Sequence, residues 1–333
     1  MTRDKSICLE DIEAARNRIA QTVHRTRTEQ SAHLSDTTGV PVHLKLEHHQ
    51  RTGSFKLRGA TNAVLKLSDA QRVRGVVGVS TGNHGRGLAY AARQNGVRCI
   101  ICMSELVPQN KIDGIEAQGA EVRIIGRSQD DAQVEVDRLV ADGMTMIPPF
   151  DHPDIIAGQG TIGLELAEDL PDLTTALVQV SGGGLISGVA AALKARNPNV
   201  KVIGVSMERG AAMYQCQKAG KPIIVPELTT LADSLGGGIG LDNVFTFGMT
   251  RDLVDDIVLV SEVEIAEAIR QAYWQENQVI EGSGSVGIAA LLSGKVKPDG
   301  PTALLLSGGN IDMSLHHRII CGENVDVGVV VRD

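Results

Sequence analysis

The sequence predicts an α/β protein whose mainly parallel strands alternate with helices. Short apolar runs that end in turn residues alternate with helical patterns along most of the 333 residues. Apolar residues make up 42% of the chain and aromatic residues only 2%, so aliphatic side chains must fill the core. This length favours one large domain or two closely packed domains.

The first series of elements covers residues 76–141 and is expected to form a small α/β domain. Strands are expected at residues 76–80, 99–103 and 121–126, and helices at residues 84–95, 109–118 and 129–141. Cys99 and Cys102 have a C-x-x-C spacing, but in a strand this spacing sends the two thiols to opposite faces. We therefore expect two buried thiols rather than a shared metal site.

The second series of elements follows residue 152 and repeats the same alternation. Its apolar runs predict strands at residues 176–180, 201–206, 256–260 and 302–306, and its helical patterns predict helices at residues 155–170, 185–196, 263–276 and 285–292. Neither an internal repeat nor a disordered linker is visible. These elements are expected to form the larger part of the molecule.

Charge and composition exclude several classes of partner. Forty acidic against 32 basic side chains give a net charge of −8, which should repel nucleic acid. No apolar stretch approaches the ~18 residues that a membrane span needs, and the N-terminus has no apolar signal core. Five scattered cysteines argue against a disulfide framework and for a reducing compartment. We expect a soluble, cytoplasmic protein.

Four short motifs carry the chemistry. Lys56 lies in the segment 54–60, and Gly-rich turns follow three expected strands at residues 80–85, 181–185 and 307–310. A glycine triplet between a strand and a helix exposes backbone N–H groups at a helix N-terminus, which suits a phosphate. No P-loop lysine accompanies the triplet, so a cofactor with a single phosphate fits better than a nucleotide. A desolvated lysine is the group that attaches an aldehyde cofactor.

Taken together and in this order, these motifs resemble the serine/threonine dehydratase family of fold-type II pyridoxal-phosphate enzymes. The resemblance covers residues from about 12 to about 310. It implies a tryptophan synthase β-like fold with two open, twisted, mainly parallel sheets and pyridoxal 5'-phosphate in the cleft between domains. It further implies a small domain at residues 71–151, inserted into a large domain made of residues 1–70 and 152–333. A homodimer is expected.

The resemblance also implies a role for individual residues. Lys56 occupies the Schiff-base position and would act as the catalytic base, and Thr81 supplies the hydroxyl that racemising relatives use. The cofactor would be bound by Phe55, Lys56, Asn83, Gly182, Gly183, Gly184, Leu185, Glu281 and Ser307. The substrate would be bound by Ser80, Thr81, Gly82, Asn83, His84 and the glycine-rich wall at Gly237.

The implied reaction is elimination of the β-hydroxyl from a hydroxy amino acid, which yields a keto acid and ammonia. Ser307 would meet the pyridine nitrogen with a neutral hydroxyl, which favours elimination over transamination. The four glycines at residues 236–238 and 240 predict a roomy substrate wall. The whole chain looks most like hydroxyectoine-utilisation dehydratases. Threonine, serine or 3-hydroxyaspartate dehydratase activity and amino-acid racemase activity remain open.

Some positions depart from the family pattern. Ser206 and Ala212 stand where metal-activated relatives carry acidic ligands, so no metal is expected there. Arg27 replaces a usual proline. Two other classes of function compete with the dehydratase. A nicotinamide oxidoreductase would need a G-x-G-x-x-G turn, which this sequence does not have after an early strand. A noncatalytic ligand-binding protein would have no need of Lys56 and Ser307.

Overall fold

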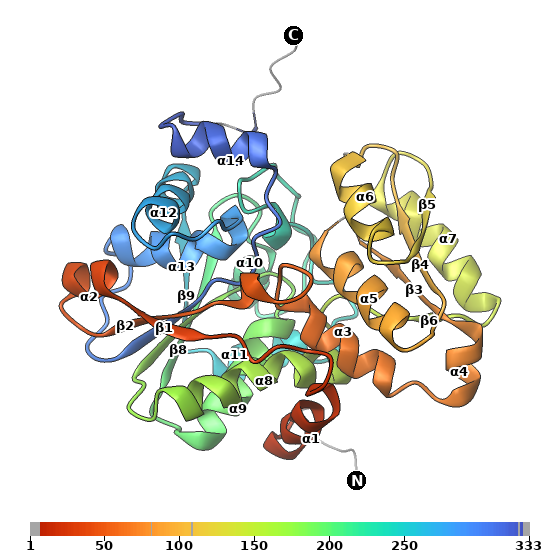
Figure 1. The fold of residues 1–333 in the computed structure, drawn as a ribbon, viewed down its shortest axis with the longest axis horizontal. Helices are drawn as coiled ribbons and strands as arrows, with labels where there is room; N and C mark the ends of the chain where they lie inside the picture. The colour runs from red at the N-terminus through yellow and green to blue at the C-terminus, as the bar shows by residue number, and fades with distance from the viewer. Residues whose placement is uncertain (1–6, 81, 108, 326, 329–333) are drawn as a thin grey trace.

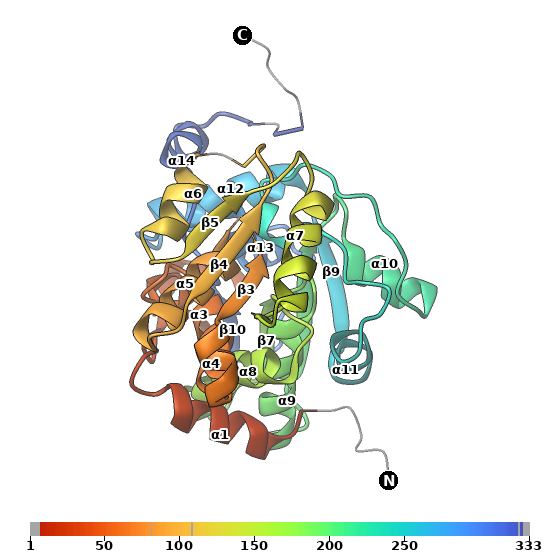
Figure 2. The ribbon, with the colours of Figure 1, turned by 90° about the vertical axis from the view of Figure 1, so that its right-hand side faces the viewer.

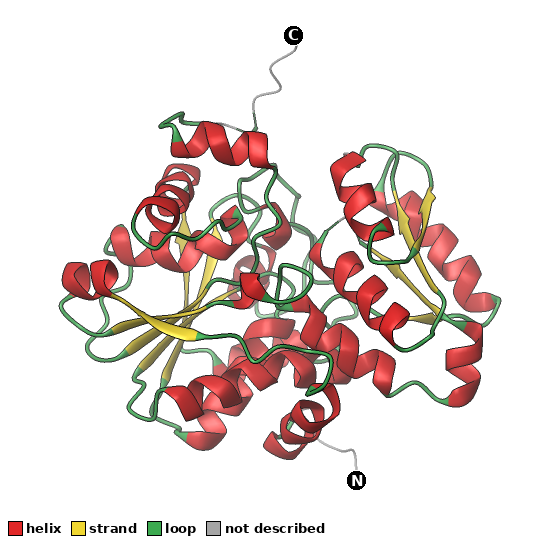
Figure 3. Cartoon of the chain, viewed as in Figure 1, coloured by secondary structure: helices red, strands yellow, loops and turns green. Residues whose placement is uncertain are grey.

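Two sheets of mainly parallel strands lie next to each other and form the body of the protein (Figure 1). The computed structural model describes residues 7–80, 82–107, 109–325 and 327–328. Strands and helices alternate along the chain, and Figure 3 shows the strands gathered in two separate groups. The expected α/β fold is confirmed.

The larger sheet has six strands in the order β1-β2-β10-β7-β8-β9, and only the β1–β2 pair is antiparallel. Its last strand in sequence, β10, therefore lies in the interior of the sheet, between β2 and β7. The strands are β1 (Thr28–Ser31), β2 (Val42–Lys45), β7 (Thr175–Gln179), β8 (Lys201–Met207), β9 (Asp256–Val260) and β10 (Thr302–Leu305).

The smaller sheet has four parallel strands in the order β5-β4-β3-β6. They are β3 (Val76–Val79), β4 (Cys99–Met103), β5 (Glu121–Ile124) and β6 (Thr145–Met146). All four fall within residues 71–151, but the domain boundaries themselves stay a prediction.

Helices cover both faces of each sheet, as Figure 2 shows for the smaller one. They are α1 (Leu9–Ile19), α2 (Ala32–Thr38), α3 (Lys56–Leu65), α4 (Asp69–Arg74), α5 (Asn83–Gln94), α6 (Gln109–Glu116), α7 (Gln129–Ala141), α8 (Pro153–Asp169), α9 (Gly184–Arg196), α10 (Ala212–Ala219), α11 (Thr246–Leu253), α12 (Glu262–Trp274), α13 (Gly282–Leu292) and α14 (Met313–Ile320), with 3-10 turns η1 (Glu47–His49) and η2 (Asp233–Leu235).

Strand residues alternate between two hydrophobic cores on opposite faces of the larger sheet. Leu177 and Leu304 pack with α12 and α13, whereas Val178 and Leu305 pack with α8 and α9. Burial of both faces explains why these strands are almost wholly apolar.

The smaller sheet follows the same rule. Cys99 packs on the α5 side and Cys102 on the α7 side, and both thiols are buried and free. The prediction that the C-x-x-C thiols point to opposite faces is confirmed. No helix in the described part of the chain has the length and apolar character to cross a membrane.

Local signals in the sequence explain where several helices begin. Ser128 and Ser261 form capping boxes with the acidic residues three positions later, at the starts of α7 and α12. Pro153 occupies the first turn of α8, where its missing N–H costs nothing. The helix α3 joins the two parts of the molecule because it packs against both α5 and α8.

Candidate active site

Lys56 is the first residue of α3, and a backbone pairing with the C-terminal part of the chain fixes its position. The Phe55 amide donates to the Ser307 carbonyl (3.0 Å), and the Gly309 amide donates to the Gly53 carbonyl (2.9 Å). These bonds flank a bridge between Ser54 and Gly308. Segments about 250 residues apart in the sequence are thus held together, which brings Lys56 and Ser307 to the same pocket.

The Lys56 side chain is half-buried, but its amine is surrounded by protein and has no carboxylate partner among the described residues. Its Nζ donates to the Pro149 carbonyl at 2.9 Å and lies 5.3 Å from the centre of the Phe55 ring. Burial lowers the pKa of Lys56 to about 8, although the nearby Glu281 opposes the shift. A substantial fraction of this amine is therefore neutral near pH 8, as a base or nucleophile requires.

The glycine turn after β7 leads directly into α9. Gly183 has φ +87°, which favours glycine, and it forms the N-cap of the helix. A Cβ atom at Gly182 would lie 2.3 Å from the Phe150 ring, and one at Gly184 would lie 2.8 Å from the Phe150 carbonyl oxygen. Side chains are thus excluded from the turn, and first-turn amides of α9, which lack intrahelical acceptors, lie beside the pocket.

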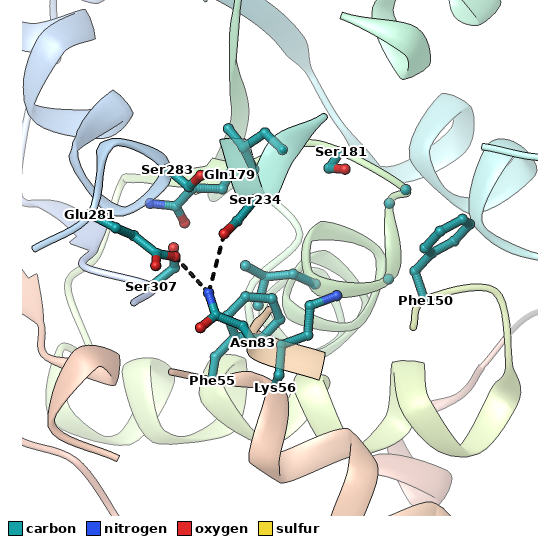
Figure 4. A pocket seen from close by; sticks show the side chains of 15 residues that line it. Phe55, Lys56, Asn83, Phe150, Gln179, Ser181, Ser234, Glu281, Ser283 and Ser307 are labelled. Carbon is teal, nitrogen blue, oxygen red and sulfur yellow. Dashed lines mark hydrogen bonds between the residues drawn. The ribbon is translucent and has the colours of Figure 1, made fainter. Parts of the chain in front are cut away.

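A hydrogen-bonded cluster forms the opposite side of the pocket (Figure 4). The Asn83 side-chain amide donates to Glu281 Oε1 (2.6 Å) and to Ser234 Oγ (3.4 Å). Its Oδ1 accepts from Asn310 Nδ2 (2.6 Å). Burial and, to a lesser extent, the charge of Asp233 raise the pKa of Glu281 to about 7, against the opposing effect of the Asn83 hydrogen bond. Glu281 is therefore a partly protonated acid at neutral pH.

All of the predicted cofactor-binding residues line a single narrow pocket. The lining includes all nine of them: Phe55, Lys56, Asn83, Gly182, Gly183, Gly184, Leu185, Glu281 and Ser307. In Figure 4 the Lys56 amine points toward the side of Phe150 and Ser181, while Glu281 and Ser307 lie on the other side.

The other predicted substrate residues are not part of this lining. Ser80 Oγ accepts from the amides of Gly82 (3.3 Å) and Gly85 (2.9 Å), so its hydroxyl caps the turn before α5. His84 is buried, its Nε2 lies 2.9 Å from the Ile147 carbonyl, and burial lowers its pKa to about 3. Gly237 has φ +92° and open space around it. Thr81 lies outside the described residues.

Sequence reasoning missed several lining residues: Phe150, Gln179, Ser234, Leu235 and Ser283. Gln179 was detectable as the single polar residue of the apolar strand expected at residues 176–180. Its Nε2 donates to the Leu305 carbonyl (2.6 Å), which leaves its buried Oε1 without a partner in the described protein. The hydroxyl of Ser283 is likewise buried and unpartnered there.

These features fit pyridoxal phosphate. Helix amides beside a side-chain-free turn suit its phosphate, and Lys56 suits its aldehyde. The unpartnered Oε1 of Gln179 and hydroxyl of Ser283 offer polar contacts at buried positions, where a vacant acceptor or donor is otherwise costly. Each end of the pocket therefore has the chemistry that this cofactor requires.

Ser206 and Ala212, which stand where metal-activated relatives carry acidic ligands, have other surroundings in this protein. Ser206 Oγ contacts Met207 Sδ at 3.3 Å, and Ala212 begins α10 in the hydrophobic core. Within the described ranges no group of three or more His, Cys, Asp or Glu side chains could hold a metal ion.

Comparison with known proteins agrees with the site. The family described as "Pyridoxal-phosphate dependent enzyme" matches residues 19–308. A Sinorhizobium fredii protein provisionally named threonine dehydratase is 59% identical, over 97% of this chain and 98% of its own length. The L-threonine ammonia-lyase of Thermotoga maritima is 43% identical, over 94% of this chain and 78% of its own length.

Solved structures agree as well. Maize serine racemase has a TM-score of 0.90 at 34% identity and covers 94% of this chain and 96% of its own. Threonine deaminase isoform 2 of Solanum lycopersicum has a TM-score of 0.87 at 35% identity, with 93% and 86% covered. The family match, the relatives and the pocket lead to one conclusion: the chain belongs to the serine/threonine dehydratase family of pyridoxal-phosphate-dependent lyases.

Proposed function

We propose that this enzyme removes the β-hydroxyl and the amino group of a hydroxy amino acid. The hydroxyl leaves as water, and one water returns when the resulting enamine hydrolyses to a keto acid and ammonia. The observation that carries the proposal is the buried Lys56 amine, whose pKa of about 8 leaves it able to accept a proton. Bound pyridoxal phosphate supplies the electron sink that acidifies the α-proton.

In this proposal Lys56 Nζ takes the α-proton, and the residues around it set the geometry. Its hydrogen bond to the Pro149 carbonyl keeps the amine inside the pocket. The amides at the start of α9 would hold the phosphate of the cofactor, and Asn83, held by Glu281, would orient its ring. Narrow walls exclude bulk water, which strengthens these polar interactions.

Ser307 supports elimination because its side chain is a neutral hydroxyl. It cannot hold the pyridine nitrogen protonated as a carboxylate would, so less charge spreads into the ring. Ser307→Asp should therefore shift product partition from keto acid toward transamination or racemisation. Unchanged partition in a folded Ser307→Asp protein would show that Ser307 does not meet the ring nitrogen.

For the substrate we propose a compound larger than threonine, including one derived from hydroxyectoine. A groove of about 960 Å³ adjoins the pocket, and Gly236 contributes to its wall. Added Cβ atoms at Gly237 and Gly238 would meet nothing within 4 Å. These two glycines line neither the pocket nor the groove, so the observation that supports a long substrate side chain is the groove itself, with Gly236 in its wall.

One assay tests the proposed reaction. The purified enzyme with pyridoxal phosphate is given serine, threonine, 3-hydroxyaspartate and a hydroxyectoine-derived hydroxy amino acid, and keto acid and ammonia are measured together. We expect equal amounts of both products. Ammonia-free turnover, or no turnover of any β-hydroxy amino acid, would reject the proposal.

Racemisation is a second candidate because the maize protein of similar fold is named a serine racemase. Chiral chromatography of residual serine after partial turnover distinguishes it: a racemase enriches the opposite enantiomer without loss of amino acid. For the cellular setting we propose a cytoplasmic homodimer. Cell fractionation and analytical ultracentrifugation test the two statements.

A further inference from the structure

Arg86 lies one helical turn beyond Asn83 on α5 and lines the groove that adjoins the pocket. Residues three apart on a helix lie on neighbouring parts of one face, so α5 presents Asn83 to the pocket and Arg86 to the groove. Glu281 lines both spaces. A substrate bound at the Lys56 amine would extend its side chain from one space into the other.

A glycine on the facing helix makes room for the Arg86 side chain. A Cβ atom at Gly114 of α6 would lie 2.2 Å from Arg86 Nη2 and 2.3 Å from Cζ. A glycine inside a helix costs about 1 kcal/mol relative to alanine. The backbone of Gly114 does not require glycine through a positive φ. Its smallness instead lets the guanidinium lie flat against α6.

The guanidinium has weak internal partners. Nη1 makes a long hydrogen bond of 3.4 Å to Asn310 Oδ1, and no described carboxylate pairs with it. The other groove cation, Lys111, already pairs with Asp233 at 2.7 Å. Burial lowers the pKa of Arg86, and Glu281, itself only partly ionised at neutral pH, opposes this. Within the part of the chain that the structure describes, four of its five N–H donors thus have no partner and remain for a ligand.

We propose that Arg86 binds a carboxylate on the side chain of the substrate, so that a dicarboxylic β-hydroxy amino acid is preferred over threonine. A guanidinium fork matches a carboxylate with two parallel hydrogen bonds. The inference rests on the proposed dehydratase reaction and narrows its substrate class. Arg86 selects the substrate and takes no proton.

The test compares substrates in matched variants of the holoenzyme. In Arg86→Gln, the ratio of kcat/KM for 3-hydroxyaspartate to kcat/KM for threonine should fall about a hundredfold. Gly114→Ala should lower the ratio in the same direction, because it displaces the guanidinium without changing its charge. Lys111→Gln removes a groove cation that is already paired, so it should keep the ratio within about threefold.

Binding gives a second readout that does not depend on turnover. By calorimetry, succinate should bind the wild-type holoenzyme more tightly than butyrate, and Arg86→Gln should remove the difference. An equal loss on threonine and 3-hydroxyaspartate would mean that Arg86 serves the α-carboxylate, and this would overturn the proposal. If no hydroxy amino acid reacts, the proposed reaction fails, while the succinate measurement still decides for or against Arg86.

Discussion

Two cations stand two residues apart on α3 and have opposite surroundings: Arg58 is fully buried and Lys56 is half-buried. Arg58 donates to both Glu47 oxygens and both Glu165 oxygens, at 2.7 to 2.9 Å, and Lys45 joins the same cluster. Burial alone would lower the pKa of Arg58, but Glu47 and Glu165 raise it above its ordinary value. Lys56 has only a carbonyl, and its pKa falls to about 8. Burial lowers the pKa of a cationic side chain, and so makes an amine reactive, only where no carboxylate partner compensates for the burial.

The largest expected effect comes from removing the unpartnered cation. Lys56→Ala should lower kcat for keto-acid formation by about 10⁴-fold or more, because the proposed base is lost. Keto acid is measured at saturating substrate. Borohydride treatment followed by peptide mass spectrometry should label Lys56 in the wild type. Lys66→Ala, at the exposed end of α3, is the control, and a label on Lys66 would refute the assignment.

Removing the partnered cation should cost stability instead. Arg58→Met leaves two buried carboxylates with too little positive charge, and we expect a loss of about 3–5 kcal/mol in the free energy of unfolding. Urea denaturation measures it. The exposed Arg138, which pairs with Glu135, is the control: Arg138→Met should cost less than about 1 kcal/mol. Similar losses in both variants would show that the buried Arg58 cluster contributes no more to the free energy of unfolding than an exposed ion pair does.

For Lys56 the comparison predicts that removing the cation stabilises the protein, whereas removing Arg58 destabilises it. The folded pKa of Lys56, about 8, lies below the ordinary 10.5, so the folded protein holds this proton less well than the unfolded chain. At pH 7, Lys56→Met should therefore stabilise the cofactor-free protein by about 3 kcal/mol. The gain should shrink as the pH rises from 8 to 10.5. A destabilised Lys56→Met protein at pH 7 would contradict an unpaired, desolvated amine.

The smallest expected effect concerns Glu281, a buried acid. Its folded pKa of about 7 exceeds the ordinary 4.5, so it makes the protein less stable as the pH rises through this window. Relative to wild type, Glu281→Gln should gain about 2 kcal/mol between pH 5 and pH 7. Unfolding in urea at both pH values measures the change, with Glu116→Gln on the surface of α6 as control. If the difference in the free energy of unfolding between Glu281→Gln and wild type were the same at both pH values, Glu281 would not be the group that titrates in this window.

Much of the site was predictable because its motifs sit at the ends of strands. The glycine turn after β7 and Ser307 after β10 could be found in this way, since parallel strands direct such turns to one edge, whereas Lys56 was indicated by the family resemblance of its motif. Phe150 and Ser234 could not, because they lie in loops without a local pattern and only the fold brings them near. The strands β1 and β2 escaped prediction because β1 has no apolar residue and β2 has only two that are not adjacent, Val42 and Leu44, so neither contains an apolar run. Arg86 looked like an ordinary charged helix residue until Gly114 was seen facing it.

The position of β10 has a consequence for synthesis of the protein. This strand lies between β2 and β7, yet it is made after both of them and after every other strand of the sheet. While the ribosome is still short of residue 305, β2 and β7 each have an unpaired edge, and exposed edges invite association with other chains. Residues 307–309 also complete the pairing beside Lys56. A nascent chain can therefore complete neither the central sheet nor the pairing beside Lys56 until residues 302–309 have emerged.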